Sequence, residues 1–211
     1  MAAPATSPIT IDAWSDVACP WCYVGKTRLD LAIKNIEAKT QTPVAVKWHP
    51  YMIDRKTKTE GEEYLAYNRR RWGSDGWTHD LRRSGAKNGL KFANWRWWPN
   101  TLNAHRLILL ADTYGKGADA KQLLLLKTYE EGANVSDVDV LWSVANELGL
   151  PGADEYLKSD RGTEEVLAQD AVAKSKLGIH SVPHFRINNM FTLSGAQDVA
   201  TFEAALSKAI S

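Results

Sequence analysis

The sequence of 211 residues contains only 2 cysteines and 8 prolines, and each scarcity excludes a class of protein. Two cysteines cannot form the disulfide framework of a small secreted domain. A hydrophobic fraction of 44% with so little proline excludes a disordered or collagen-like chain. Long apolar runs are lacking as well, because the leucine run at 123–126 is far below the roughly 18 residues that a membrane-spanning helix needs. We therefore expect a globular protein without a membrane partner.

A charge excess of one sign is also lacking, since 26 Lys and Arg against 25 Asp and Glu give a formal net charge of +1. Basic residues are concentrated in 55–96 and acidic ones in 137–170, which we interpret as solvated faces. The sequence thus offers no electrostatic argument for a nucleic-acid partner. Residues 1–14 contain neither a basic segment nor the apolar segment of about 7–15 residues of a secretory signal, so we expect a cytoplasmic protein.

Hydrophobic periodicity predicts a strand, a helix and a strand at the start of the chain. Apolar residues alternate at Ile9, Ile11 and Ala13, and they recur at helical spacing through Ile36. The segment 44–48 then predicts a second strand. A β-α-β unit of this length predicts a parallel strand pair with a right-handed crossover.

The strand pattern nearly disappears between residues 60 and 177, where we predict a helical insertion. Helices are predicted over 61–71, 101–114, 118–131, 137–148 and 163–177, and a loop-rich linker over 73–89. Strands return at 184–187 and 190–193 as a hairpin around Asn188-Asn189, followed by a helix over 198–210. The predicted fold class is therefore α/β with an inserted helical subdomain.

The two cysteines form a Cys-Pro-Trp-Cys motif where the first strand leads into the helix. A thiol at a helix N-terminus meets unpaired N–H groups and the positive end of the helix dipole, so we expect the pKa of Cys19 to be lowered. We assign Cys19 as the attacking sulfur and Cys22, about one turn further on, as the resolving thiol. Cys19 would form a mixed disulfide with a substrate, and Cys22 would then displace the substrate. Pro20 restricts the first turn, and Trp21 supplies an aromatic wall for substrate.

Half of a zinc site is an alternative interpretation of this motif, because His180 and His184 would supply matching ligand types. The 157 residues between Cys22 and His180 argue against it, since compact zinc sites usually pair their halves within a short stretch. Two inert buried cysteines are a further alternative. We expect no metal.

Four separated stretches resemble the FrnE-like branch of the DsbA family of thioredoxin-fold oxidoreductases, over about residues 9–210. They are SDVACPWCYVGK at 15–26, NTLNAHR at 100–106, EGANVSD at 131–137, and GIHSVP at 178–183 together with SGAQ at 194–197. Four motifs in the same order are far more specific than a lone Cys-x-x-Cys.

The resemblance implies a thioredoxin-like core, residues 8–59 and 178–211, interrupted by an all-helical subdomain, residues 60–177. It implies that Pro183 is a cis-proline facing the cysteine pair and that Val182 and Pro183 contact the substrate backbone. The implied activity is thiol-disulfide exchange, as reductase, isomerase or oxidase, on a disulfide-containing protein or a small thiol. The cysteine pair itself would be the redox centre, without another cofactor, and glutathione is a candidate co-substrate.

Polar residues around the motif are candidates for proton transfer and substrate binding. The resemblance places His105 in the subdomain that covers the cysteine pair, where it could donate to the Cys19 thiolate or to a substrate carbonyl. An ordinary hydrogen-bonded helix histidine is the alternative. Thioredoxins carry a buried acid six residues before the first cysteine, where this chain has Ala13. Asp12 is expected on the opposite strand face, and Asp16 as a helix cap or a solvated carboxylate that opposes thiolate formation.

Other activities remain open alternatives. Tryptophans at 72, 77, 95, 97 and 98 could line a groove for apolar substrate segments or pack in the core. A sister branch contains glutathione-dependent kappa transferases and hydroxychromene-carboxylate isomerases, which generally have serine where Cys19 stands. A secondary-metabolism enzyme acting on an aromatic polyketide and a metal-binding or interaction protein are further alternatives.

Overall fold

The first half of the sheet is the predicted β-α-β unit. In the computed structural model, which describes residues 7–210, β1 (Ile9–Ser15) is followed by α1 (Pro20–Thr40) and β2 (Val44–Pro50). The strands β1 and β2 are parallel, with Ile9 opposite Val44 and Ser15 opposite Pro50. This confirms the predicted parallel pair. Of the segment 1–14 in which a secretory signal was considered, the first six residues lie outside the described residues, as does Ser211.

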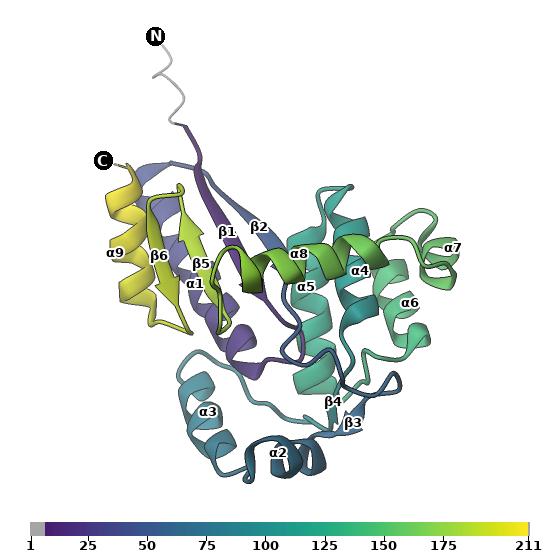
Figure 1. Cartoon of the computed structure of the whole chain (residues 1–211). Helices are drawn as coiled ribbons and strands as arrows, with labels where there is room; N and C mark the ends of the chain where they lie inside the picture. The colour runs from purple at the N-terminus through teal and green to yellow at the C-terminus, as the bar shows by residue number, and fades with distance from the viewer. Residues whose placement is uncertain (1–6, 211) are drawn as a thin grey trace.

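The second half of the sheet is the predicted hairpin. Strand β5 (His184–Ile187) lies antiparallel to β1, and β6 (Phe191–Ser194) lies antiparallel to β5, so the strand order is β2-β1-β5-β6. Both turn residues, Asn188 and Asn189, have positive φ angles, which asparagine tolerates better than most residues. Helix α9 (Val199–Ile210) packs against α1 and completes one covering layer (Figure 1).

The segment between the two halves is mainly helical. It contains β3 (Glu62–Glu63), α2 (Tyr64–Trp72), α3 (Trp77–Ala86), β4 (Trp97–Trp98), α4 (Leu102–Asp112), α5 (Gly117–Leu126), the π-helical turn η1 (Lys127–Glu131), α6 (Val138–Glu147), α7 (Ala153–Lys158) and α8 (Thr163–Ser175). In one detail the all-helical prediction is wrong, because β3 and β4 form a two-stranded antiparallel ribbon. The region 73–89, predicted as a loop, contains α3.

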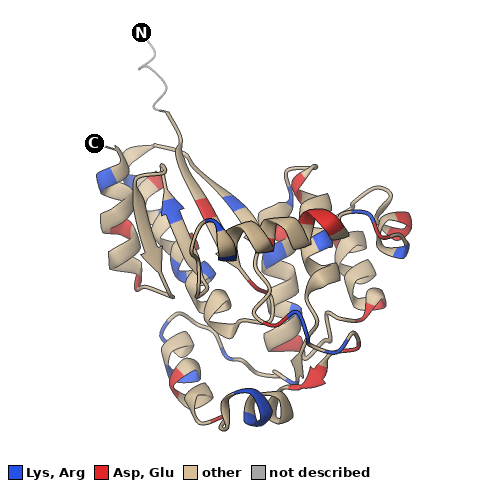
Figure 2. Ribbon diagram, in the orientation of Figure 1, with Lys and Arg blue, Asp and Glu red and all other residues tan. Residues whose placement is uncertain are grey.

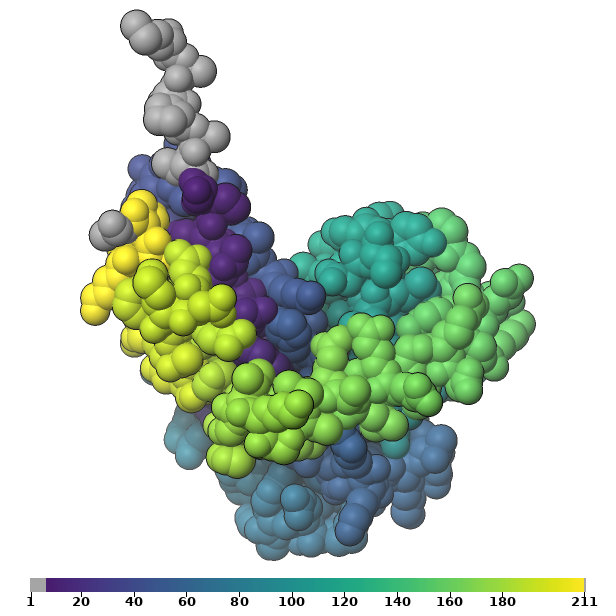
Figure 3. Space-filling view, turned by 45° about the horizontal axis from the view of Figure 1, so that its top comes forward, coloured from purple at the N-terminus to yellow at the C-terminus, as the bar shows by residue number. Residues whose placement is uncertain are grey.

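The inserted helices surround one end and one side of the sheet. In Figure 1, α2 and α3 lie below the end at which β1 leads into α1, and α8 runs back from α7 toward the sheet. Helices α5 and α8 both pack against β2. Figure 3 shows the surface hollowed between the core strands and these helices. A cavity of about 300 Å³ lies there, with walls that include Trp48 of β2 and Leu110 of α4.

The basic run at 55–96 is partly neutralised by ion pairs. Arg70 binds Glu62 at 2.7 Å, and the Arg55 guanidinium binds the fully buried Asp170 at 2.6 Å. Figure 2 shows basic residues gathered on α2. No helix within residues 7–210 is long and apolar enough to cross a membrane.

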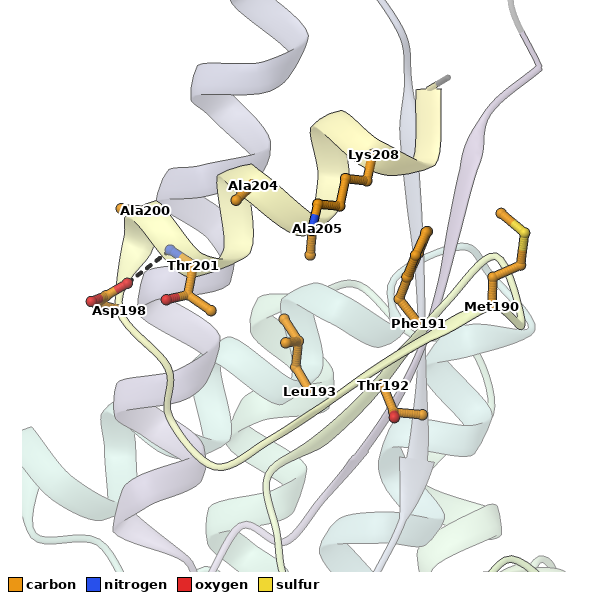
Figure 4. A pocket seen from close by; sticks show the side chains of 10 residues that line it. All are labelled: Met190, Phe191, Thr192, Leu193, Asp198, Ala200, Thr201, Ala204, Ala205 and Lys208. Carbon is orange, nitrogen blue, oxygen red and sulfur yellow. Dashed lines mark hydrogen bonds between the residues drawn. The ribbon is translucent and has the colours of Figure 1, made fainter.

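A second surface cavity lies away from the cysteine motif, between the edge strand β6 and α9. Its volume is about 600 Å³, and Phe191, Leu193, Thr201 and Ala205 are among the residues that line it (Figure 4). None of the predicted site residues contributes to its walls. The predicted chemistry therefore has to be sought at the other end of the sheet.

Candidate active site

Cys19 and Cys22 lie where β1 ends and α1 begins. Cys19 precedes the first helical residue, Pro20, in extended conformation, and its carbonyl oxygen accepts the Cys22 N–H at 2.9 Å. Both thiols are free. Cys19 retains 5% exposure and Cys22 none, so a substrate can approach only the first sulfur. The sequence analysis expected Cys22 to be the more buried of the two thiols, and the exposed fractions have this order.

The loop before β5 brings Val182 and Pro183 to the cysteine pair. The Cys19 Sγ–H donates to the Val182 carbonyl oxygen at 3.6 Å, and the Val182–Pro183 peptide bond is cis. Pro183 also packs against α1 at Gly25, where an added Cβ would lie 2.7 Å from the proline Cγ. The glycine in the first motif thus allows the loop to approach the helix closely.

The pKa values of the two thiols are shifted in opposite directions. The hydrogen bond to Cys22 and burial raise the pKa of Cys19 well above its ordinary value, and the Asp16 carboxylate adds to the rise. Burial opposes ionisation of Cys22 too, but the hydrogen bond from Cys19, the Lys121 ammonium and the Ser15 hydroxyl outweigh it and lower the pKa of Cys22. This direction is opposite to the lowering expected from the helix N-terminus, because the Cys22 thiol and burial both act against ionisation of Cys19.

Asp16 is a buried carboxylate that organises the loop before Cys19. It accepts hydrogen bonds from the backbone N–H of Ile53 at 2.7 Å and of Ala18 at 3.3 Å. Burial opposes ionisation of the Asp16 carboxyl group, but the hydrogen bonds to it have the larger effect, and the strongest of them comes from His105. The pKa of Asp16 is therefore lowered. Asp16 is therefore an internal anion and neither a helix cap nor a solvated residue.

The structure places His105 on Asp16, with its Nε2 3.3 Å from Oδ1, and shows no hydrogen bond from His105 to Cys19. The imidazole is 2% exposed, and burial lowers its pKa although Asp16 acts in the opposite direction. A neutral imidazole that donates Nε2–H to the carboxylate satisfies both groups. His105 therefore acts on the cysteine loop through Asp16.

Asp12 lies on the opposite face of β1, as its register predicts. Its carboxylate contacts His49 Nε2 at 2.7 Å and Arg186 at 3.2 Å. Ala13, the neighbour that occupies the position of the thioredoxin acid, is fully buried in the core. The structure thus directs Asp12 away from the cysteine pair.

Two polar residues near the pair were not singled out from the sequence. Lys121 of α5 is 1% exposed, with its Nζ 6.0 Å from the centre of the Trp48 ring. Burial lowers its pKa to about 8, although the cysteine pair and Asp16 counteract that effect. The Ser15 hydroxyl is buried without a conventional hydrogen-bond partner. In the sequence, the burial of Lys121 is indicated only by its position beside Ala120 and Leu124 on the apolar face of the helix.

An apolar cavity of about 420 Å³ opens beside Cys19. The walls consist of the motif residues and side chains of α2, α3, β4 and the loop after β2: Cys19, Pro20, Trp21, Ile53, Trp72, Trp77 and Trp98. Trp98 is held by stacking on Tyr67 at 4.1 Å, and Trp72 meets Trp98 edge-on at 5.1 Å. Three of the five clustered tryptophans thus line the cavity, whereas Trp95 packs in the core against Tyr64.

The residues weighed as zinc ligands can be located in the structure. Within residues 7–210 no three His, Cys, Asp or Glu side chains are arranged to hold a metal ion. His184, one of the two histidines considered as ligands, instead contacts the Ser194 hydroxyl through Nδ1 at 3.0 Å.

Comparison with known proteins shows which family the chain resembles. A family model described as a DSBA-like thioredoxin domain matches residues 10–207. A probable DsbA oxidoreductase from Streptomyces coelicolor is 25% identical, with a TM-score of 0.82 over 95% of this chain and 89% of that chain.

Two more distant structures share the fold. A 2-hydroxychromene-2-carboxylate isomerase is 15% identical, with a TM-score of 0.73 over 94% of this chain and 95% of that chain. The cytosolic disulfide reductase DsbM from Pseudomonas aeruginosa with GSH is 21% identical, with a TM-score of 0.63 over 94% and 98% of the two chains. These likenesses support the thioredoxin-like fold with its insertion.

Proposed function

The chain belongs to the DSBA-like thioredoxin domain family, and from that membership we propose that it is a thiol-disulfide oxidoreductase that works through Cys19 and Cys22. The observation that carries the proposal is the pairing of an accessible sulfur with an enclosed one a turn away. A substrate disulfide can reach Cys19 from the tryptophan-lined cavity, and the enclosed Cys22 is the partner sulfur.

The exchange takes place in two steps. Cys19 loses its proton to solvent and attacks one sulfur of a substrate disulfide. A Cys19–substrate bond forms, the substrate S–S bond breaks, and the leaving thiolate takes up a proton from solvent. The Cys22 thiolate then attacks Cys19 Sγ, which releases the second substrate thiolate and leaves Cys19 and Cys22 joined. The substrate is reduced by two electrons and the cysteine pair is oxidised; the reverse sequence oxidises a dithiol.

Val182 and the aromatic cavity are the proposed substrate contacts. The Val182 carbonyl oxygen loses its thiol donor when Cys19 becomes bonded to substrate, so it can then accept an N–H from an extended substrate chain. Pro20, Trp21 and Pro183 bound the approach to Cys19. The cavity walls are almost wholly apolar, which favours disulfides that carry apolar or aromatic groups.

Reduction or isomerisation is the proposed direction in the cytoplasm. A dithiol in a compartment poised by glutathione rests largely reduced unless its potential is unusually low. The shared fold with the cytosolic reductase DsbM, whose structure includes GSH, supports a cytoplasmic location and glutathione as a partner. A disulfide-containing protein or a small disulfide would be the substrate, and the cysteine pair would be the only cofactor needed.

Insulin-disulfide reduction by single-cysteine variants tests the proposal. Cys19→Ser should abolish turnover because it removes the accessible sulfur. Cys22→Ser should also stop turnover, since no resolving thiol remains, while Cys19 still reacts once. Turnover by Cys19→Ser at the wild-type rate would refute the assignment.

Glutathione-dependent isomerisation is a second candidate, favoured by the shared fold of the isomerase and by the apolar cavity beside the motif. That chemistry needs no resolving thiol. Isomerisation or conjugation that persists in a double variant, Cys19→Ser with Cys22→Ala, would favour it over disulfide exchange.

A further inference from the structure

Strand β6 is an edge of the four-stranded sheet, and no strand within residues 7–210 pairs with its outer side. The opposite edge, β2, packs against α5 and α8. An exposed edge presents free N–H and C=O groups to any other strand, so proteins usually protect it with charged side chains or proline. The segment 190–197 contains neither. The outer side of β6 is therefore open to a further strand.

The hydrogen-bond pattern of the hairpin determines which backbone groups face outward. The Gly195 N–H donates to the Pro183 carbonyl oxygen at 2.8 Å. Because bonded residues alternate along an antiparallel ladder, every second residue counted back from Gly195 bonds to β5, and Thr192 and Ser194 direct their N–H and C=O groups outward. The Ser194 carbonyl oxygen accepts from the Gln197 side chain at 2.6 Å. Among the described residues this leaves the Ser194 N–H and both groups of Thr192 for a partner.

A groove runs along this edge between β6 and α9, and it is the cavity of about 600 Å³ in Figure 4. Phe191 and Leu193 line it on the strand side, and Ala205 lines it on the helix side. Met190, another lining residue, is 65% exposed, more than any other large apolar residue within residues 7–210. Because removal of apolar surface from water favours association, the β6–α9 groove favours an apolar occupant.

The two ends of the β6–α9 groove carry opposite charges (Figure 4). Asp198 lies just before α9, where its carboxylate accepts the Thr201 N–H at 2.8 Å. Lys208 lies in the last turn of α9, which a 3.1 Å hydrogen bond from Asn188 Nδ2 to the Ala209 carbonyl oxygen holds beside the hairpin turn. Both charged residues are exposed, and no ion pair within residues 7–210 includes either of them. Each charge is therefore available to a partner.

We propose that β6 pairs with β6 of a second copy of this chain, antiparallel and about a two-fold axis that passes near Thr192. The N–H and C=O groups of Thr192 then exchange two hydrogen bonds with the same groups of the second copy. Phe191 lies opposite Leu193 of the second copy, and this apolar contact occurs twice by symmetry. The pairing is independent of the proposed function.

Charge complementarity favours a second copy of this chain as the partner. A two-fold axis across the strand reverses the direction of the groove, so the end with Lys208 meets the end of the other copy that has Asp198. Two pairs of opposite charges form in this way, whereas a parallel arrangement would bring like charges together. The groove is therefore complementary to itself.

The same geometry limits the assembly to two copies. Pairing uses the outer side of β6 in both copies, and β2 cannot extend the sheet in turn because α5 and α8 pack against it. Cys19 does not line the groove, so the cysteine pair of each copy stays accessible. The expected assembly is a closed dimer with two open sites.

Sedimentation equilibrium over a range of protein concentrations tests the association. Wild type should show a reversible monomer–dimer equilibrium. Thr192→Pro should be monomeric over the same range because it lacks the central N–H donor, and it should fold because proline is tolerated in an edge strand where the N–H faces outward. A wild type that is monomeric up to about 1 mM, or that forms larger assemblies, would overturn the proposal. This readout needs no substrate, so an inactive but dimeric wild type would refute the proposed function alone.

Charge reversal tests the partner and the orientation. Lys208→Glu places two carboxylates at each end of the dimer, and Asp198→Lys places two ammonium groups there. Either variant alone should raise the Kd of the dimer by about tenfold or more, because each contact occurs twice. An equimolar mixture of the two variants should associate about as tightly as wild type, since every end again joins opposite charges. A mixture that associates no more tightly than the single variants would overturn the proposal.

Two controls separate charge from structure. Asp198→Ser keeps a side chain that can cap α9 and removes the charge, so it should weaken the dimer less than Asp198→Lys does. Lys47→Glu reverses an exposed cation on the opposite edge strand, and it should leave the Kd unchanged. If Thr192→Pro does not fold, the mixture of charge variants remains decisive. The same Kd for wild type and for every folded variant of the groove would overturn the proposal.

Discussion

Gly25→Ala is a sharp test of the contact between α1 and the Val182–Pro183 loop. Alanine inside a helix is normally favoured over glycine by about 1 kcal/mol, so the substitution should stabilise a helix with free space at this position. Here the new Cβ would lie 2.7 Å from Pro183 Cγ and 3.5 Å from Ala196 Cα. Overpacking of this kind costs about 1–3 kcal/mol. The two effects together predict a net loss of up to about 2 kcal/mol.

The same change should reduce activity, because relief of the overlap moves Pro183 and Val182 away from Cys19. Urea denaturation would measure the stability, and insulin reduction would measure the turnover. Gly76→Ala is the matched control, since its added Cβ meets only the Ser74 hydroxyl at 3.3 Å. A Gly25→Ala protein that is more stable than wild type and fully active would refute the packing argument.

Three further substitutions test other parts of the site. Trp98→Leu removes part of the cavity wall, so it should lower kcat/KM for a diaryl disulfide by about tenfold and change the value for oxidised glutathione little. The control is Trp142→Leu, which changes an exposed tryptophan. Equal losses for both substrates would contradict a binding role of Trp98. Because the pKa of Asp16 is lowered in the folded protein, its ionisation stabilises the fold above the unfolded value near 3.8, and this contribution is lost as the pH falls toward the folded pKa. Urea midpoints measured against pH should therefore show a smaller acid loss in Asp16→Asn, and an identical profile would contradict the assignment. Asp170 accepts a hydrogen bond from the Met52 backbone N–H and forms ion pairs with Arg55 and Lys174. Asp170→Ala should therefore lower the free energy of unfolding by about 3–5 kcal/mol. A loss below about 1 kcal/mol in urea denaturation would refute this structural role.

Local periodicity was sufficient to predict the sheet but not every inserted helix. The parallel pair follows from apolar alternation on both sides of a helical segment, and the hairpin follows from the turn residues between its strands. Helix α3 was missed because its buried face consists of Thr78, Leu81 and Gly85, of which only one is a large apolar residue. Trp77 and Leu81 are the only large apolar residues on the face of α3 that packs against the core, so the stripe is too short to indicate a helix by itself.

The candidate site could be located from the sequence, whereas its electrostatics could not. The Cys19–Cys22 spacing and the motif around Pro183 identified the residues that the fold brings together. The pKa of Cys19 is raised mainly by the hydrogen bond to Cys22 and by burial, and the pKa of Cys22 is lowered by the hydrogen bond from Cys19 and by Lys121, which lies about a hundred residues from the pair in sequence. The helix dipole argument failed because it considered α1 alone. His105 was likewise placed near the site, but its partner is Asp16.

The most direct test of the proposed chemistry is the mass of the Cys22→Ser protein after incubation with a disulfide substrate, followed by mapping of the modified peptide. The expected product is a single substrate fragment joined to Cys19, which the wild-type protein does not retain because Cys22 displaces it. Absence of any adduct on Cys19, or lasting retention of the same adduct by the wild type, would contradict the central claim.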